Sequence, residues 1–150
     1  MHNVYQQGRP TGCMAACVAS ILEIPLNDVP ECFDNNKVNG QWTWDQFKQR
    51  EWLAARGCGV IELRGLELCM YPPTGGILCI VSNPPPAGFS QSATCVSRTR
   101  VCQDHPVELV HNPSREIDNY YCCLFDRNTI VTFLIPLNDK IAPGVPPLNV

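Results

Sequence analysis

Near the N-terminus, residues 10–25 read PTGCMAACVASILEIP. The larger apolar residues of this stretch recur with the period of one helix face, at Met14, Cys17, Val18 and Ile21, with small residues between them. Gly12 precedes this pattern, and Pro25 cannot continue a helix. The stretch therefore predicts a buried helix over residues 13–24, with Cys13 in or beside its first turn.

The chain that follows predicts one more helix and then a sheet. Thr43 with Gln46 three residues later resembles a capping box, and Gly57 is a typical C-terminal residue, so we expect a helix over 44–56. Short apolar runs separated by turn residues then predict strands over 60–63, 77–82, 94–102, 107–111 and 129–135. Helices followed by strands favour an α+β domain, with the N-terminal helices packed on one side of an antiparallel β-sheet.

Length and composition indicate a single domain. The 150 residues fit one compact unit, which we expect over 1–141, and the proline-rich residues 142–150 are typical of an extended tail. The net charge is −3 and the eleven basic residues are scattered, so the sequence argues against a nucleic-acid partner. No apolar run is long enough to span a membrane. The oligomeric state stays open.

Ten cysteines raise the question of disulfides or metal. Without a sequence typical of an export signal, they are more simply interpreted as reduced thiols, which favours the cytoplasm. The paired spacing of a zinc site, such as Cys-x-x-Cys, is absent from the sequence. We therefore expect neither a metal nor another cofactor.

Cys13 is the candidate nucleophile. At a helix N-terminus the unpaired N–H groups and the helix dipole stabilise a thiolate, and the same N–H groups can donate to an oxyanion. Gln7, six residues upstream, is near enough in sequence to add a side-chain amide donor. The alternative interpretation is a buried structural cysteine.

Several motifs carry a resemblance to a known superfamily. They are Gln7 with Cys13, then CMAACVASIL (13–22), PLNDVP (25–30), WLAARG (52–57) and VHNPS (110–114). The chain resembles the papain-like cysteine peptidases, in particular the double-glycine leader peptidase domains and small phage and bacterial proteins with that fold. The resemblance covers roughly residues 5–136 and implies a papain-like fold, a Cys13 nucleophile and an oxyanion donor at Gln7.

The resemblance also implies a histidine base on a strand, oriented by an Asp or Asn. Asn112 matches the orienting position, but Ala93 stands where the histidine is expected, with Ser92 as the one-residue alternative. Three explanations follow: an engineered His→Ala change, a natural pseudoenzyme, or a different route to Cys13 from His105 or His111. Alternation along a strand argues against His111, because it and Asn112 point to opposite faces.

The sequence thus predicts a thiol hydrolase for an amide, isopeptide or related acyl bond, inactive in this form, with a protein or peptide as substrate. One alternative is a binding or decoy module that uses the same cleft without turnover. Another keeps the scaffold but acts on a small-molecule amide or ester, because a shared fold does not fix the reaction.

Overall fold

The structure is a computed structural model that describes residues 1–6, 9, 11–35, 37–70, 75–83, 93–102, 105–114, 125 and 127–137. Its α-helices are α1 (Cys13–Leu22), α2 (Gln46–Ala54) and α3 (Gly65–Met70), with 3₁₀ turns at Leu26–Asp28 and Glu31–Phe33. Its strands are β1 (Lys37–Val38), β2 (Gln41–Trp42), β3 (Cys58–Arg64), β4 (Leu78–Asn83), β5 (Ala93–Thr99), β6 (Val107–His111) and β7 (Ile130–Pro136). The expected tail, 142–150, lies outside the described residues.

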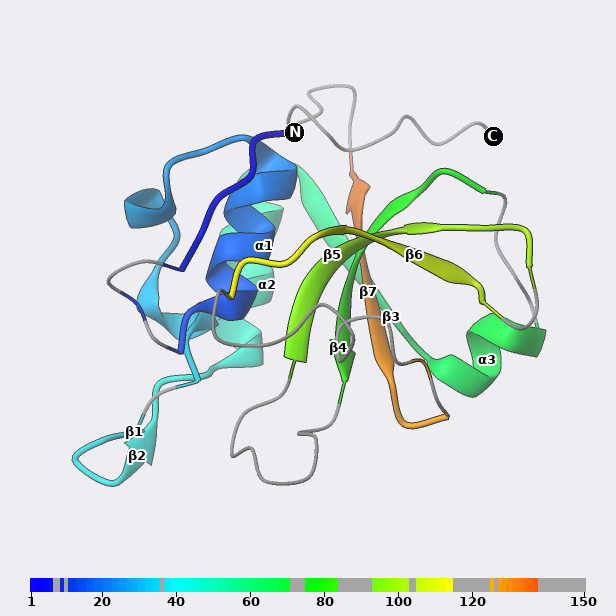
Figure 1. Ribbon diagram of the computed structural model, residues 1–150. Helices are drawn as coiled ribbons and strands as arrows, with labels where there is room; N and C mark the ends of the chain where they lie inside the picture. The colour runs from blue at the N-terminus through cyan, green and yellow to red at the C-terminus, as the bar shows by residue number, and fades with distance from the viewer. Residues whose placement is uncertain are drawn as a thin grey trace.

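Five of these strands form one sheet in the order β3-β7-β4-β5-β6, and every neighbouring pair is antiparallel. The last described strand, β7, lies between β3 and β4, as Figure 1 shows. Strands β1 and β2 form a separate hairpin. The structure therefore confirms the α+β class and the antiparallel sheet.

One face of the sheet is covered by the two N-terminal helices (Figure 1). All residues of α1 except Met14 are buried, because small residues allow close packing against the sheet. This core joins α1 and Leu53 of α2 to Ile80, Val96 and Leu134 of the central strands. The prediction of a buried first helix is confirmed.

The opposite face of the sheet carries a second apolar cluster that the sequence did not predict. Leu68 of α3 is fully buried there with Cys79 and Val81 of β4, Cys95 of β5 and Val131 of β7. The expected packing of the N-terminal helices on one side of the sheet is thus confirmed. The helix α3, which the sequence analysis did not predict, follows β3 directly and packs its only large buried side chain, Leu68, against the opposite face.

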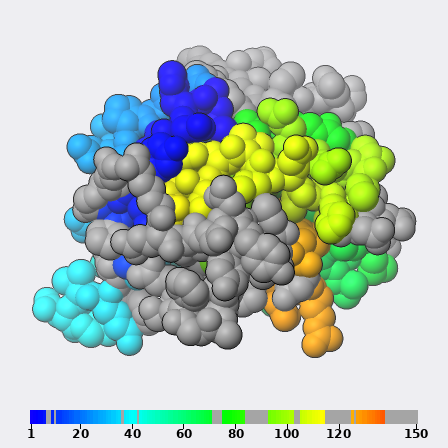
Figure 2. Space-filling model, viewed as in Figure 1, coloured from blue at the N-terminus to red at the C-terminus, as the bar shows by residue number. Residues whose placement is uncertain are grey.

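The N-terminal segment is held on the molecule by the end of β6. The ring nitrogen Nε2 of His111 lies 2.7 Å from the carbonyl oxygen of Val4, and the N–H of Gln6 donates to the carbonyl of Pro113 at 3.2 Å. Figure 2 shows this dark blue segment lying against the yellow residues that end β6. Two parts of the chain about a hundred residues apart in sequence therefore meet beside α1.

Candidate active site

Cys13 is the first residue of α1 and is 7% exposed. The residue before it, Gly12, has no side chain to cap the helix. A Cβ at Gly12 would lie 2.9 Å from the Cβ of Arg9, closer than real contacts allow, so this tight approach requires glycine. The predicted position of Cys13 in the first turn is confirmed, and the helix dipole favours negative charge there.

A glutamine side chain lies on the sulfur of Cys13, and it belongs to Gln6. The thiol donates to Oε1 of Gln6 at 2.6 Å, and Nε2 of Gln6 donates to Oγ of Ser114 at 3.2 Å. Gln7, the predicted oxyanion donor, lies outside the described residues. The sequence analysis did not consider Gln6, because the six-residue spacing of the resemblance pointed to its neighbour Gln7.

Asn112 is connected to the same group of side chains. Its Oδ1 accepts a hydrogen bond from the backbone N–H of Ser114 at 3.0 Å, and the Ser114 hydroxyl holds Gln6. The structure therefore brings Asn112 into the network that ends at Cys13. It does so through Ser114, a residue that the sequence analysis did not single out.

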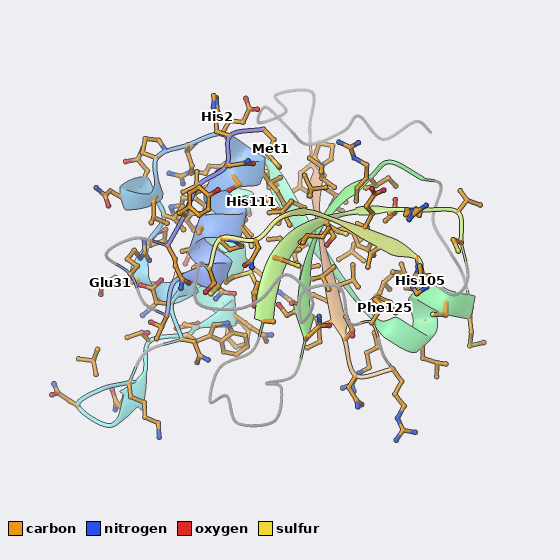
Figure 3. All side chains as sticks on the ribbon, viewed as in Figure 1. Met1, His2, Glu31, His105, His111 and Phe125 are labelled. Atoms are coloured by element: carbon orange, nitrogen blue, oxygen red, sulfur yellow. The ribbon has the colours of Figure 1, made fainter. Side chains whose placement is uncertain are left out.

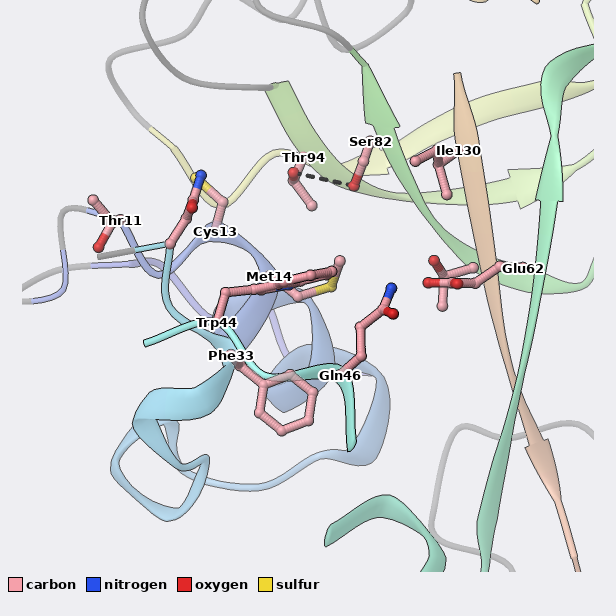
Figure 4. Close-up of a pocket in the computed structure, with 12 residues that line it drawn as sticks. Thr11, Cys13, Met14, Phe33, Trp44, Gln46, Glu62, Ser82, Thr94 and Ile130 are labelled. Atoms are coloured by element: carbon pink, nitrogen blue, oxygen red, sulfur yellow. Dashed lines mark hydrogen bonds between the residues drawn. The ribbon is translucent and has the colours of Figure 1, made fainter. Parts of the chain in front are cut away.

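A pocket of about 260 Å³ opens beside Cys13, between α1 and the sheet (Figure 4). Met14, Phe33 and Trp44 form an apolar wall on the helical side. The sheet side is mostly polar: its lining residues are Glu62 of β3, Ser82 of β4, Thr94 of β5, and Ile130 and Thr132 of β7. The remaining lining residues are Thr11, Asn35 and Gln46.

Strand β5 presents Thr94, and not Ala93, to this pocket. Thr94 shares a hydrogen bond of 3.2 Å with the hydroxyl of Ser82, which lies opposite it on β4. Ala93 is fully buried in the second apolar cluster, on the face away from α1. The structure therefore does not bring Ala93 and Cys13 together, because neighbouring residues of a strand point to opposite faces. Ser92 lies outside the described residues.

No histidine lines the pocket among the described residues. His111 is 5% exposed, bonds to Val4 and contacts the ring of Tyr5 edge to face at a centroid distance of 4.9 Å. His105 is exposed and lies beside α3, at the far end of the molecule from α1 (Figure 3). His111 thus holds the N-terminal segment, and the structure brings neither His105 nor His111 to Cys13.

The Thr132 hydroxyl in the pocket wall is left without a hydrogen bond within the part of the chain that the structure describes. Oγ1 of Thr132 has no hydrogen-bond partner among the described residues, and the residue is only 6% exposed, so its hydroxyl is also shielded from water. A buried polar group without a partner destabilises the folded state. The isosteric variant Thr132→Val is therefore expected to raise the free energy of unfolding by about 1 kcal/mol, measured by urea denaturation.

Thr129→Val is the matched control for that measurement. Thr129 is fully buried, but its hydroxyl donates to Oδ1 of Asn83 at 2.8 Å, so the same substitution removes a bond. We expect it to lower the free energy of unfolding by about 1–3 kcal/mol. A loss of stability in Thr132→Val equal to that of the control would show that the Thr132 hydroxyl has a partner.

Comparison with family models, with curated proteins and with solved structures found no match to the chain. Within the part of the chain that the structure describes, no helix has the length and apolar character of a membrane span, and no group of three His, Cys, Asp or Glu side chains is arranged to hold a metal ion. The site is therefore defined by its own geometry, with the Cys13 thiol, the Gln6 amide and the adjoining pocket.

Proposed function

We propose that the chain has a papain-like fold and a cysteine-hydrolase site, with Cys13 as the nucleophile for an amide, isopeptide or related acyl bond of a protein or peptide. The observation that carries the proposal is the position of Cys13: it begins a buried helix, opens onto a pocket and contacts a side-chain amide. A thiolate there would attack the carbonyl carbon, the C–N bond would break as the amine leaves with the proton from the thiol, and water would then hydrolyse the acyl-enzyme.

Gln6 is the proposed oxyanion donor in place of Gln7. Its Oε1 accepts from the thiol in the resting arrangement. Rotation of the Gln6 side-chain amide by about 180° would direct Nε2 toward the reacting centre and Oε1 toward Ser114. The Ser114 hydroxyl can serve both arrangements, since a hydroxyl both accepts and donates. The first-turn N–H groups of α1 supply the other donors that stabilise the oxyanion.

The described residues of the pocket include no histidine that could serve as the general base of such a site. Among the described residues that line the pocket, none is His, Lys or Arg, and Thr94 faces Cys13 from β5. An imidazole at position 93 would point into the second apolar cluster, which argues against the hypothesis of an engineered His→Ala change at that position. We therefore expect Cys13 to react slowly in this chain.

The test is to supply the missing base at Thr94. In Thr94→His the imidazole can take the thiol proton, so carbamidomethylation of Cys13 by iodoacetamide at pH 7 should be about 10²-fold faster. The matched control, Thr94→Gln, has similar bulk but no basic nitrogen. Mass spectrometry of the Cys13 peptide gives the rate for that thiol alone, and Cys13→Ala confirms the peptide assignment.

Three of the other thiols are held in the unreactive, protonated form at this pH. Burial raises the pKa of the Cys79 thiol to about 12. Burial also raises the pKa of Cys58, and it raises that of Cys32, where the nearby Asp45 carboxylate acts in the same direction. These groups stay protonated at pH 7, and a thiol is a weak nucleophile.

The absence of a histidine from the described pocket lining also supports a second candidate function. A pocket that holds a peptide without cleaving it would make the chain a binding module. Equal Cys13 labelling in Thr94→His and Thr94→Gln would refute the hydrolase proposal and leave this one.

A further inference from the structure

The sheet side of the pocket is built from two rows of neighbouring residues. Glu62 on β3 lies opposite Thr132 on β7, and Thr132 lies opposite Ile80 on β4. In the next row, Thr94 on β5 lies opposite Ser82. Directly opposed side chains share a face with their Cβ atoms about 5 Å apart, so the Glu62 carboxylate and the Thr132 hydroxyl stand side by side.

Glu62 is the only charged residue among the described residues that line the pocket. Figure 4 shows its side chain reaching from β3 toward Gln46 and Met14. Its ion-pair partner, Arg50, lies at 3.6 Å, and the two side chains are 59% (Arg50) and 36% (Glu62) exposed. Such a long, exposed pair is weak, so the carboxylate keeps most of its attraction for another cation.

The Thr132 hydroxyl adds an independent sign of a ligand. It is buried beside Glu62, lines the pocket and has no partner within the described protein. Oγ1 of Thr11, at the Cys13 end of the pocket, is also buried and unpartnered within the described protein. Because buried polar groups in folded proteins are nearly always hydrogen-bonded, these two hydroxyls indicate a polar ligand.

The remaining features define the ligand's shape. Met14, Phe33 and Trp44 offer apolar surface for a hydrocarbon stem, and an aromatic face also attracts a cation. The volume of about 260 Å³ is below the usual range for drug-sized ligands, which suits one amino-acid side chain. Cys13 at the rim would then lie beside the peptide backbone that carries this side chain.

We propose that the pocket receives a basic side chain of a peptide, lysine or arginine, whose cationic end lies between Glu62 and Thr132. This proposal deepens the proposed function, because it names the side chain held next to the bond that Cys13 would attack. It concerns binding alone, however, and its test requires no bond cleavage.

The probes are N-acetyl-lysine methylamide, its norleucine counterpart and n-pentylamine. Norleucine keeps the hydrocarbon stem without the ammonium group, and n-pentylamine keeps the ammonium group without the peptide backbone. Binding is measured by NMR titration on the indole N–H signal of Trp44, assigned with Trp44→Phe. The lysine probe is expected to bind at least about tenfold more tightly than norleucine, the difference that one charge-assisted hydrogen bond provides.

Two variants connect that preference to the named residues. Glu62→Gln should reduce the preference for lysine over norleucine to less than about twofold, and Thr132→Val should weaken lysine binding by about threefold or more without affecting norleucine. Glu51→Gln is the matched control, since it removes the same charge from the exposed side of α2, outside the pocket. The Glu51→Gln variant should prefer the lysine probe over norleucine as strongly as the unsubstituted chain does.

Equal binding of lysine and norleucine, no binding of either, or a preference that survives Glu62→Gln would each overturn the proposal. If n-pentylamine bound as tightly as the lysine probe, the claim that the ligand is a peptide would be overturned. These results are separate from the fate of the hydrolase proposal: lysine selectivity with equal Cys13 labelling in Thr94→His and Thr94→Gln would leave a lysine-binding module.

Discussion

Replacing Arg9 by methionine is expected to lower the free energy of unfolding by about 3–5 kcal/mol, because it leaves a buried carboxylate without its partner. The guanidinium group donates to both carboxylate oxygens of Asp34, at 2.7–3.2 Å, and to the carbonyls of Leu26, Val29 and Pro30, at 2.6–3.2 Å. The Asp34 side chain is only 5% exposed, so water cannot replace these bonds.

The control for Arg9→Met is Arg50→Met. The Arg50 side chain is 59% exposed and its ion pair with Glu62 is 3.6 Å long, so the same substitution should cost less than about 1 kcal/mol. Urea denaturation followed by circular dichroism measures both values. If the two variants lost the same stability, the Arg9 cluster would contribute no more than a surface pair.

The Arg9 cluster also affects the site. It holds the segment from Leu26 to Asp34, and that segment carries Phe33 into the wall of the pocket. Since Arg9→Met loosens this wall, we expect it to weaken ligand binding as well as stability. Its place in the fold could not be predicted from the sequence, where Arg9 is one basic residue in a turn, and its partners lie 17 to 25 positions away.

Local patterns predicted the elements that local forces determine. The strand expected over 107–111 is β6, Val107–His111, and the left-handed conformation expected at Gly57 is present at φ +74°. The expected cap of α2 was wrong: Asp45 accepts from the N–H groups of Phe47 and Lys48, whereas the Thr43 hydroxyl donates to the carbonyl of Asp34. Tertiary contact with the Asp34 segment decided between two capping residues, Thr43 and Asp45, which are two positions apart.

The site could be predicted only in part, for a similar reason. The start of α1 depends on nearby residues, and Cys13 was found there. The alternation of β5 distinguishes two faces, but the sequence does not say which face meets α1. Thr94 was therefore missed, and the resemblance favoured its neighbour Ala93. Glu62 and Thr132 come together only because β3 pairs with β7. These two strands are far apart in sequence, with β4, β5 and β6 between them.

The variant Ala93→His tests which face of β5 points toward Cys13. Ala93 is fully buried among Leu68, Cys95 and other apolar side chains of the second cluster. An imidazole there would overfill packed space and bury a polar group without a partner, and each effect costs about 1–3 kcal/mol. We therefore expect the free energy of unfolding to fall by about 3–5 kcal/mol, measured by urea denaturation.

Thr94→His is the matched variant on the neighbouring residue. Its side chain faces the pocket, which has room for an imidazole, and it loses only the 3.2 Å hydrogen bond to Ser82. The cost should be about 1 kcal/mol, while Ala93→His, under conditions where circular dichroism shows it folded, should leave the labelling rate of Cys13 unchanged. The opposite pattern, a stable and fast-labelling Ala93→His, would mean that β5 presents its other face to Cys13. The two histidine variants therefore measure the orientation of one strand independently of any substrate.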